Sequence, residues 1–262
     1  MVTQDIKQHY NHVARNRHER LLSKSYNVWQ FNHDIRERII RKFIGGCGPL
    51  DRGIDIGTGT GVWAEILSEY CSNVDGIDFA EENIRIASKN AKNLEIDNRL
   101  SYSVCDAQTL IGIPDKYYNV ATQVSVLQHI PDQNECIRRI SNILDTNGYL
   151  ILLVHNRKCI YNRNLVMQRK SGGQVSVNEY STLPEIKKIL SDSGFDILHV
   201  RFSWLFLNDF LFLGKERWYL KPFNPIRLIL ISAFSQIDLM LGRLCILNIF
   251  FREIVLIARK IS

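Results

Sequence analysis

The sequence has little of what would place it outside the ordinary globular class. The six cysteines are widely spaced and include no C-x-x-C pair, so neither a disulfide framework nor a zinc site is indicated. The chain starts with polar residues instead of the apolar stretch of a secretory signal, which predicts an intracellular, cytoplasmic protein. The uncharged stretch 228–237 has ten residues, whereas a membrane helix needs about 20.

The formal net charge of +6 is unevenly distributed along the chain. Residues 1–46 carry 9 Lys+Arg and 4 Asp+Glu, residues 47–156 carry 8 and 15, and residues 157–262 carry 16 and 8. An acidic middle suits a cationic cofactor, and basic flanks suit an anionic substrate, an anionic membrane surface or nucleic acid. Solvated helix faces would give the same pattern.

Short apolar segments alternate with helical stretches through the middle of the chain, which predicts a mostly parallel sheet covered by helices on both faces. Apolar spacing over 10–44 predicts one or two amphipathic helices. The predicted strands are 53–56, 73–78, 100–104, 118–124, 149–154, 194–200 and 254–259, and the helices between them are 62–67, 81–92, 133–144 and 183–193. Ligands of such sheets bind at the carboxyl ends of the strands.

A glycine-rich turn follows the first predicted strand, as Asp55-Ile56-Gly57-Thr58-Gly59-Thr60-Gly61, and Asp78 ends the next strand 17 residues after Gly61. With its further matches, this pattern resembles the small-molecule (type 11 and 12) branch of the class I methyltransferases over roughly residues 35–200. The further matches are Gly76-Ile77-Asp78, Cys105-Asp106-Ala107, Val126-Leu127-Gln128-His129-Ile130, Gly148-Tyr149-Leu150 and Ser193-Gly194-Phe195.

The resemblance implies a Rossmann-like α/β fold with a seven-stranded sheet whose last strand is antiparallel, and S-adenosylmethionine as the cofactor. Asp78 would accept hydrogen bonds from both ribose hydroxyls, and Asp55 would face the cationic methionine end. Phe79 would lie against the adenine, Asp106 would accept from its amine, and the Ala107 amide would reach the ring. The other predicted cofactor contacts are the backbones of Gly57, Gly59, Gly61 and Val124 and the side chain of Gln128. Asp106 could alternatively be a helix N-cap.

Two histidines follow strands that open onto this crevice, His129 and His155. If a hydroxyl is methylated, either could act as general base. Each also has a structural alternative, because His129 could bond backbone at a helix start and His155 could bond the loop after it. Tyr180 is the predicted substrate contact, although a surface tyrosine is equally ordinary.

Several other functions remain open or are disfavoured. A nicotinamide dehydrogenase would have glycine where Val62 stands, and Asp55 would lie awkwardly beside a pyrophosphate. The segment 123–126 lacks the Asn/Asp-Pro-Pro-aromatic motif of amino-methylating nucleic-acid enzymes, and the chain has no Pro-Cys dipeptide. We therefore expect methyl transfer to a small molecule, at a hydroxyl oxygen. The alternatives are a membrane-associated lipid or quinone methyltransferase, a tRNA-modifying enzyme, and a non-catalytic adenosyl-binding domain.

The expected domain organisation is an N-terminal helical cap over 1–46 and a methyltransferase domain over 47–262, with a hydrophobic insertion at about 204–251. The insertion could pack into the core, form an apolar lid or lie on a membrane near anionic headgroups. A lid would suit a quinone, polyketide, fatty acyl or lipid-linked acceptor. The sequence indicates neither a metal nor an oligomeric state.

Overall fold

The computed structural model describes residues 28–160, 162, 180–205, 233, 236–244 and 249–261. The predicted helical segment before residue 28 and most of the predicted insertion lie outside these residues. No helix of the described part is both long enough and apolar enough to span a bilayer.

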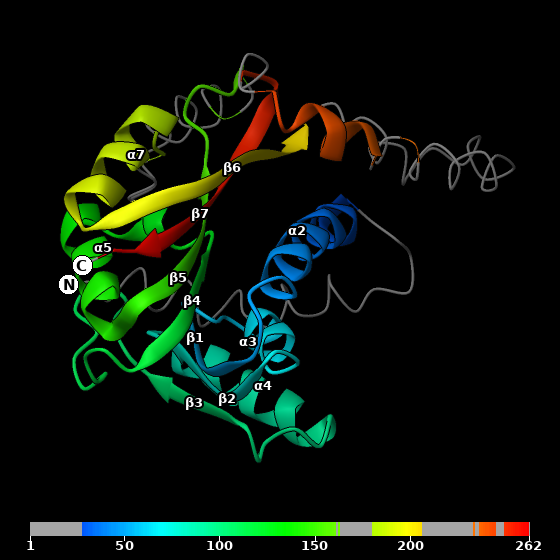
Figure 1. Cartoon of the computed structure of the whole chain (residues 1–262). Coiled ribbons are helices and arrows are strands. Elements are labelled where there is room, and N and C mark those ends of the chain that lie inside the picture. The colour runs from blue at the N-terminus through cyan, green and yellow to red at the C-terminus, as the bar shows by residue number, and fades with distance from the viewer. Residues whose placement is uncertain are drawn as a thin grey trace, which may run out of the picture.

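Seven strands form one sheet in the order β3-β2-β1-β4-β5-β7-β6 (Figure 1). The first five strands in this order run parallel to one another, whereas β7 lies between β5 and β6 and is antiparallel to both. The predicted sheet, with an antiparallel last strand, is confirmed. The strands are β1 (Leu50–Ile56), β2 (Cys71–Asp78), β3 (Leu100–Val104), β4 (Tyr118–Val124), β5 (Leu144–His155), β6 (Phe195–Leu205) and β7 (Phe251–Lys260).

Helices cover both faces of this sheet, α5 and α7 on one side and α2, α3 and α4 on the other (Figure 1). The helices are α2 (Val28–Ile44), α3 (Val62–Leu67), α4 (Glu81–Asn93), the 3-10 turn η1 (Leu127–His129), α5 (Gln133–Ile143) and α7 (Leu183–Asp192). α2 buries Phe31, Ile35 and Ile39, four residues apart, so one stripe of the helix faces the sheet. The predicted cap helix therefore shares a core with the sheet.

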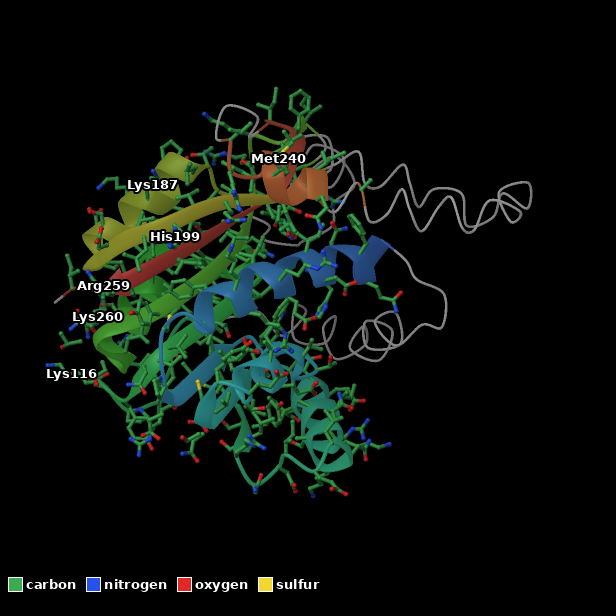
Figure 2. All side chains as sticks on the ribbon, turned by 45° about the vertical axis from the view of Figure 1, so that its right-hand side comes forward. Lys116, Lys187, His199, Met240, Arg259 and Lys260 are labelled. Carbon is green, nitrogen blue, oxygen red and sulfur yellow. The ribbon has the colours of Figure 1, made fainter. Side chains whose placement is uncertain are left out.

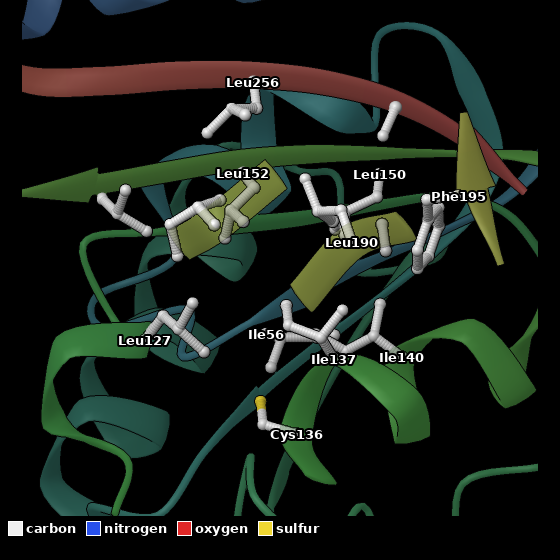
Figure 3. Packing of buried hydrophobic residues seen from close by; sticks show 14 of the residues in the cluster. Ile56, Leu127, Cys136, Ile137, Ile140, Leu150, Leu152, Leu190, Phe195 and Leu256 are labelled. Atoms are coloured by element: carbon white, nitrogen blue, oxygen red, sulfur yellow. The ribbon is translucent and has the colours of Figure 1, made fainter. Parts of the chain in front are cut away.

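The two faces of the sheet have separate cores because side chains alternate along each strand. Figure 3 shows one of them, in which Ile137 and Ile140 of α5 and Leu190 of α7 pack against Leu150 and Leu152 of β5. The α2 face holds the intervening residues, including Ile151 and Leu153 of β5 and Val255 of β7. We call this second side the α2 face.

The strand boundaries differ most from the prediction at β5, which starts at Leu144 and not at Tyr149, and at β6, which ends at Leu205 and not at Val200. The residues of segment 145–148 favour a turn, and Asn147 does have a positive φ of 66°. In the structure this segment is an irregularity within β5, because the pairing of β5 with β4 shifts register between Tyr118 and Val120. The predicted helix 133–144 consequently ends at Ile143, one residue early.

The described free cysteines are Cys47, Cys71, Cys105, Cys136 and Cys159, in agreement with reduced thiols.

Basic side chains gather at the end of the sheet opposite the carboxyl ends of the parallel strands. Figure 2 shows Lys116, Arg259 and Lys260 close together there, where the Lys260 ammonium donates to the Leu144 carbonyl. Burial and the nearby Lys116 lower the pKa of Lys260. These cations lie away from the strand ends at which ligands of such sheets bind.

Candidate functional site

Asp55, near the carboxyl end of β1, lies on the α2 face with its side chain 1% exposed. Its neighbours Ile54 and Ile56 pack on the opposite face. Thr122, its register partner on β4, donates its hydroxyl to Asp55 Oδ1 at 2.7 Å. Oδ2 and the neighbouring Thr58 hydroxyl make no hydrogen bond of normal length and angle among the described residues, although the Thr58 side chain and the Ala64 amide lie close enough to lower the pKa of Asp55.

Burial is the main reason that the pKa of Asp55 is raised to about 6. The hydrogen bond from Thr122 opposes this rise, whereas the charge of Asp78 adds to it. A buried carboxylate with a raised pKa and an unused oxygen is an acceptor for a cationic or hydrogen-bond-donating ligand.

The glycine turn after β1 has positive φ angles at Gly57, Gly59 and Gly61, of 74°, 56° and 97°. The three glycines have different surroundings, and the sequence pattern alone does not distinguish them. A Cβ on Gly57 would lie 2.3 Å from Val126, and one on Gly61 would lie 2.7 Å from the Tyr102 hydroxyl. Those two positions are restricted by protein packing. Only at Gly59 would a Cβ meet nothing within 4 Å, so this is where the backbone is open to a ligand.

Asp78 ends β2 beside this turn, because the amides of Gly57 and Thr58 both donate to the Ile77 carbonyl at 2.8 Å. Its carboxylate accepts from Gly59 N at 2.9 Å and from Ala80 N at 2.8 Å. Asp78 thus fixes the open part of the turn. An ionised carboxylate offers about four lone-pair sites, so these two bonds leave capacity for hydroxyl donors.

The residues predicted to hold the adenine follow β2 and β3. Phe79 comes directly after Asp78 and is half-buried. Asp106 accepts a hydrogen bond from Gln108 N at 2.9 Å, and Ala107 is buried. Residues 107–109 form a turn, so the alternative that Asp106 caps a helix is wrong. The Asp side chain stabilises a turn instead.

The side chains of Gln128 and His129, which follow β4, lie close to each other. Gln128, 2% exposed, donates its side-chain amide to the Ser125 carbonyl at 2.7 Å, and the same nitrogen lies 3.3 Å from His129 Nε2. The His129 amide donates to the Val126 carbonyl. Val124, the last residue of β4, is buried on the α2 face. His129 thus belongs to a tight 3-10 turn, and its ring lies beside the side chain of Gln128.

His155 ends β5 on the α2 face, two residues beyond Leu153. Its ring lies 5.0 Å from the ring of Tyr180, so the structure brings together the predicted base and the predicted substrate contact. Tyr180 is 8% exposed and is not a surface tyrosine. His155 Nδ1 also lies 4.0 Å from Oε1 of Glu253 on β7.

The sequence analysis missed a set of polar residues around His155. Glu253 is fully buried and paired with Arg36 of α2, and Ser203 of β6 donates to it at 3.1 Å. A charged residue beside the apolar run of β7 was the one available signal. The partners could not be found from local patterns, because Arg36 and Glu253 lie 217 positions apart.

The α2 face of the sheet thus carries both the predicted cofactor residues, Asp55 and Asp78, and the candidate base His155. Asp55 and Asp78 lie at the ends of β1 and β2, and His155 lies on β5, which is separated from β1 by β4 alone. Adjacent strands are about 4.8 Å apart, so the two groups are roughly 10 Å apart across the sheet. The parallel strands all present their carboxyl ends at this edge.

Two surface hollows on the described part of the chain lie elsewhere. One is at the amino ends of β1 and β4 and includes Asp51 and Asn119, and the other runs between α2 and α3 past Glu37 and Glu65. No predicted cofactor, base or substrate residue lines either of them.

Comparison with known proteins identifies the family. A family model described as "Methyltransferase domain" matches residues 15–200, well over half of the chain. The match extends the predicted resemblance toward the N-terminus and includes the glycine turn, Asp78 and both candidate histidines.

Curated relatives include a ubiquinone biosynthesis O-methyltransferase of Leptothrix cholodnii, 25% identical over 162 residues, which are 59% of this chain and 68% of that protein. The ubiquinone biosynthesis O-methyltransferase of Psychrobacter arcticus is 24% identical over 57% of this chain and 62% of its own length. The chain thus spans about two thirds of the length of these relatives.

Solved structures share the fold at low identity. Magnesium protoporphyrin IX methyltransferase from Synechocystis, with bound SAH, superposes with a TM-score of 0.63 at 15% identity, covering 97% of this chain and 98% of that one. This similarity confirms the predicted fold class.

The family match excludes the nicotinamide dehydrogenase alternative and agrees with the acidic residues at the ends of β1 and β2. The chain belongs to the methyltransferase domain family, and it is a class I, S-adenosylmethionine-dependent methyltransferase of the small-molecule type.

Proposed function

We propose that this protein transfers a methyl group from S-adenosylmethionine to a hydroxyl oxygen of an apolar small molecule of the phenol or quinol type. The observation that carries the proposal is the shared face of the sheet, on which Asp55 and Asp78 lie beside the open glycine and His155 lies on β5. Support for the acceptor class comes from the relatives named ubiquinone biosynthesis O-methyltransferase.

The residues at the strand ends fit the cofactor. Asp55 Oδ2 and the Thr58 hydroxyl are buried and make no hydrogen bond of normal geometry among the described residues, and the backbone at Gly59 is open. Asp55 would hold the cationic methionine end, and Asp78 would accept from the ribose. Phe79, Asp106 and Ala107 would surround the adenine, as their places after β2 and β3 allow.

The bound cofactor supplies a methyl group on a sulfonium, which is already a good leaving group. The remaining tasks of this chain are to align the acceptor, to exclude water and to take a proton from a hydroxyl. His155 is the better candidate base of the two histidines, because it lies on the α2 face beside Tyr180, whereas His129 is engaged in the turn after β4. Tyr180 would contact the acceptor.

Replacing Asp78 with alanine is expected to weaken the binding of S-adenosylmethionine by about a hundredfold or more, because two charge-assisted hydrogen bonds of about 1.5–3 kcal/mol each are lost. Isothermal titration calorimetry measures this change. Asp97→Ala removes an exposed carboxylate from the loop after α4 and serves as the matched control. Equal affinities of wild type and D78A would refute the ribose assignment.

A screen with methyl-labelled cofactor tests the acceptor. Phenols and quinols with and without an isoprenoid tail should accept label, and the products should carry it on oxygen. Transfer to tRNA or to lipid headgroups alone would overturn the proposed acceptor class while leaving the cofactor site intact.

A further inference from the structure

An ion pair is buried at the edge where the candidate base lies. Glu253 of β7 is fully buried, and Arg36 of α2 is 13% exposed. Arg36 Nε donates to Glu253 Oε2 at 2.9 Å, and Arg36 Nη2 donates to Oε1, so the contact is bidentate. The Ser203 hydroxyl of β6 donates to Oε2 as well. A carboxylate removed from water to this degree needs such partners.

The register of the sheet sets His155 directly opposite this carboxylate. His155 and Glu253 are paired residues of antiparallel β5 and β7, and Ser203 is the partner of Glu253 on β6. His155 Nδ1 lies 4.0 Å from Glu253 Oε1, slightly beyond hydrogen-bond length. Such contacts are often long in the absence of substrate and shorten when it binds.

We propose that the Arg36–Glu253 pair is a positioning device for His155: Glu253 holds the Nδ1 side of the imidazole, so that Nε2 takes the proton of the acceptor, and Arg36 fixes Glu253 and moderates its charge. The proposal rests on the proposed function, in which His155 is the base. Arg36 and Glu253 are positioning residues, since both act through His155.

The arrangement predicts the signs of two shifts in the pKa of His155, and a positioning role predicts in addition a change in the balance of its two ring tautomers. Among the described residues, the groups seen near the His155 ring include Glu253 of β7, Arg36 behind it on α2, and the phenol ring of Tyr180. The carboxylate favours the protonated ring and the guanidinium opposes it. Removing one charge or the other should therefore shift the His155 titration in opposite directions.

The test is a ring titration of His155 by nitrogen-15 NMR on the full chain, with the signal assigned by its loss in His155→Gln. Glu253→Gln is expected to lower the pKa of His155 by about one unit, and Arg36→Gln to raise it by a similar amount. The double variant R36Q/E253Q should return it close to the wild-type value. The relative populations of the two ring tautomers should change in E253Q as well.

The double variant keeps the test decisive if Arg36→Gln fails to fold. E253Q and R36Q/E253Q then differ only in the charge of Arg36, and the pKa of His155 should be lower in E253Q. A His155 titration that is the same in wild type, E253Q and the double variant would overturn the proposal.

The test distinguishes failure of the proposed function from failure of the positioning proposal. Cofactor affinity should be unchanged in E253Q, because β7, which carries Glu253, is separated from β1 and its cofactor residues by both β4 and β5. With an identified acceptor, E253Q should lower kcat and move the acidic limb of the pH–rate profile to lower pH. Opposite shifts of the His155 titration together with full activity of His155→Gln would retain the coupling and reject His155 as base.

Discussion

Replacing Asp55 with asparagine is expected to stabilise the folded protein by about 2 kcal/mol at neutral pH while weakening S-adenosylmethionine binding about a hundredfold. The carboxyl is fully buried, and its pKa is raised from 3.8 to about 6. A shift of roughly two units corresponds to about 3 kcal/mol of cost for the ionised form in the folded state. Asparagine removes that cost, keeps an oxygen for Thr122, and loses part of the gain to its own amide donor.

The pH dependence gives the sign of the effect. Between the unfolded value near 3.8 and the folded value of about 6, the folded state retains a proton on Asp55 that the unfolded state has released. The contribution of Asp55 to stability therefore falls as the pH rises through this window. The advantage of D55N should be small at about pH 4 and complete at about pH 7.

Urea unfolding of both proteins at several pH values measures this difference, and calorimetry measures cofactor binding in the same buffers. In the wild type, cofactor affinity should fall below about pH 6, since a protonated Asp55 carries no charge to meet a cation. Thr122→Val removes the hydrogen bond to Asp55 but keeps the buried carboxyl, so this variant separates the effect of the hydrogen bond from the effect of burying the carboxyl. An asparagine variant that is less stable at all pH values would show that the hydrogen bonds of the carboxylate outweigh the cost of its burial.

Replacing Arg36 with glutamine is expected to destabilise the protein by about 3–5 kcal/mol, because Glu253 would be left as a buried charge without its guanidinium. R36Q/E253Q should recover most of this loss, since two neutral amides need no charge partner. Urea unfolding at neutral pH measures all three proteins. Arg85→Gln, which breaks an exposed pair with Glu82 on α4, is the matched control and should change stability little. Equal losses in R36Q and in the double variant would show that the pair contributes packing alone.

The parts of the structure that follow from local sequence were predicted well. The segment 118–124 is β4 and 62–67 is α3, as expected, because an apolar run and a glycine turn set their limits. The antiparallel β7 came from the family resemblance and is confirmed. The cofactor contacts of Asp55 and Asp78 stay predictions, although the structure sets both at the same edge of the sheet.

Contacts between distant segments could not be predicted from periodicity. The pairing of His155 with Glu253 depends on the register of β5 and β7, and the contact with Arg36 depends on how α2 lies across the sheet. The turn signal at 145–148 was misleading for a related reason. Pairing with Tyr118 extends β5 back to Leu144 in spite of local residues that favour a turn.

The hairpin pairing of β6 with β7 has an evolutionary consequence. Leu205 and Phe251 are register partners, so both ends of the intervening stretch are anchored by the sheet itself. The entropic cost of connecting two such fixed strand ends grows slowly with the length of the connection, by roughly 0.6 kcal/mol for each doubling. Because the sheet itself sets this register, Ser203, Glu253 and His155 can keep their alignment when the length of chain between Leu205 and Phe251 changes.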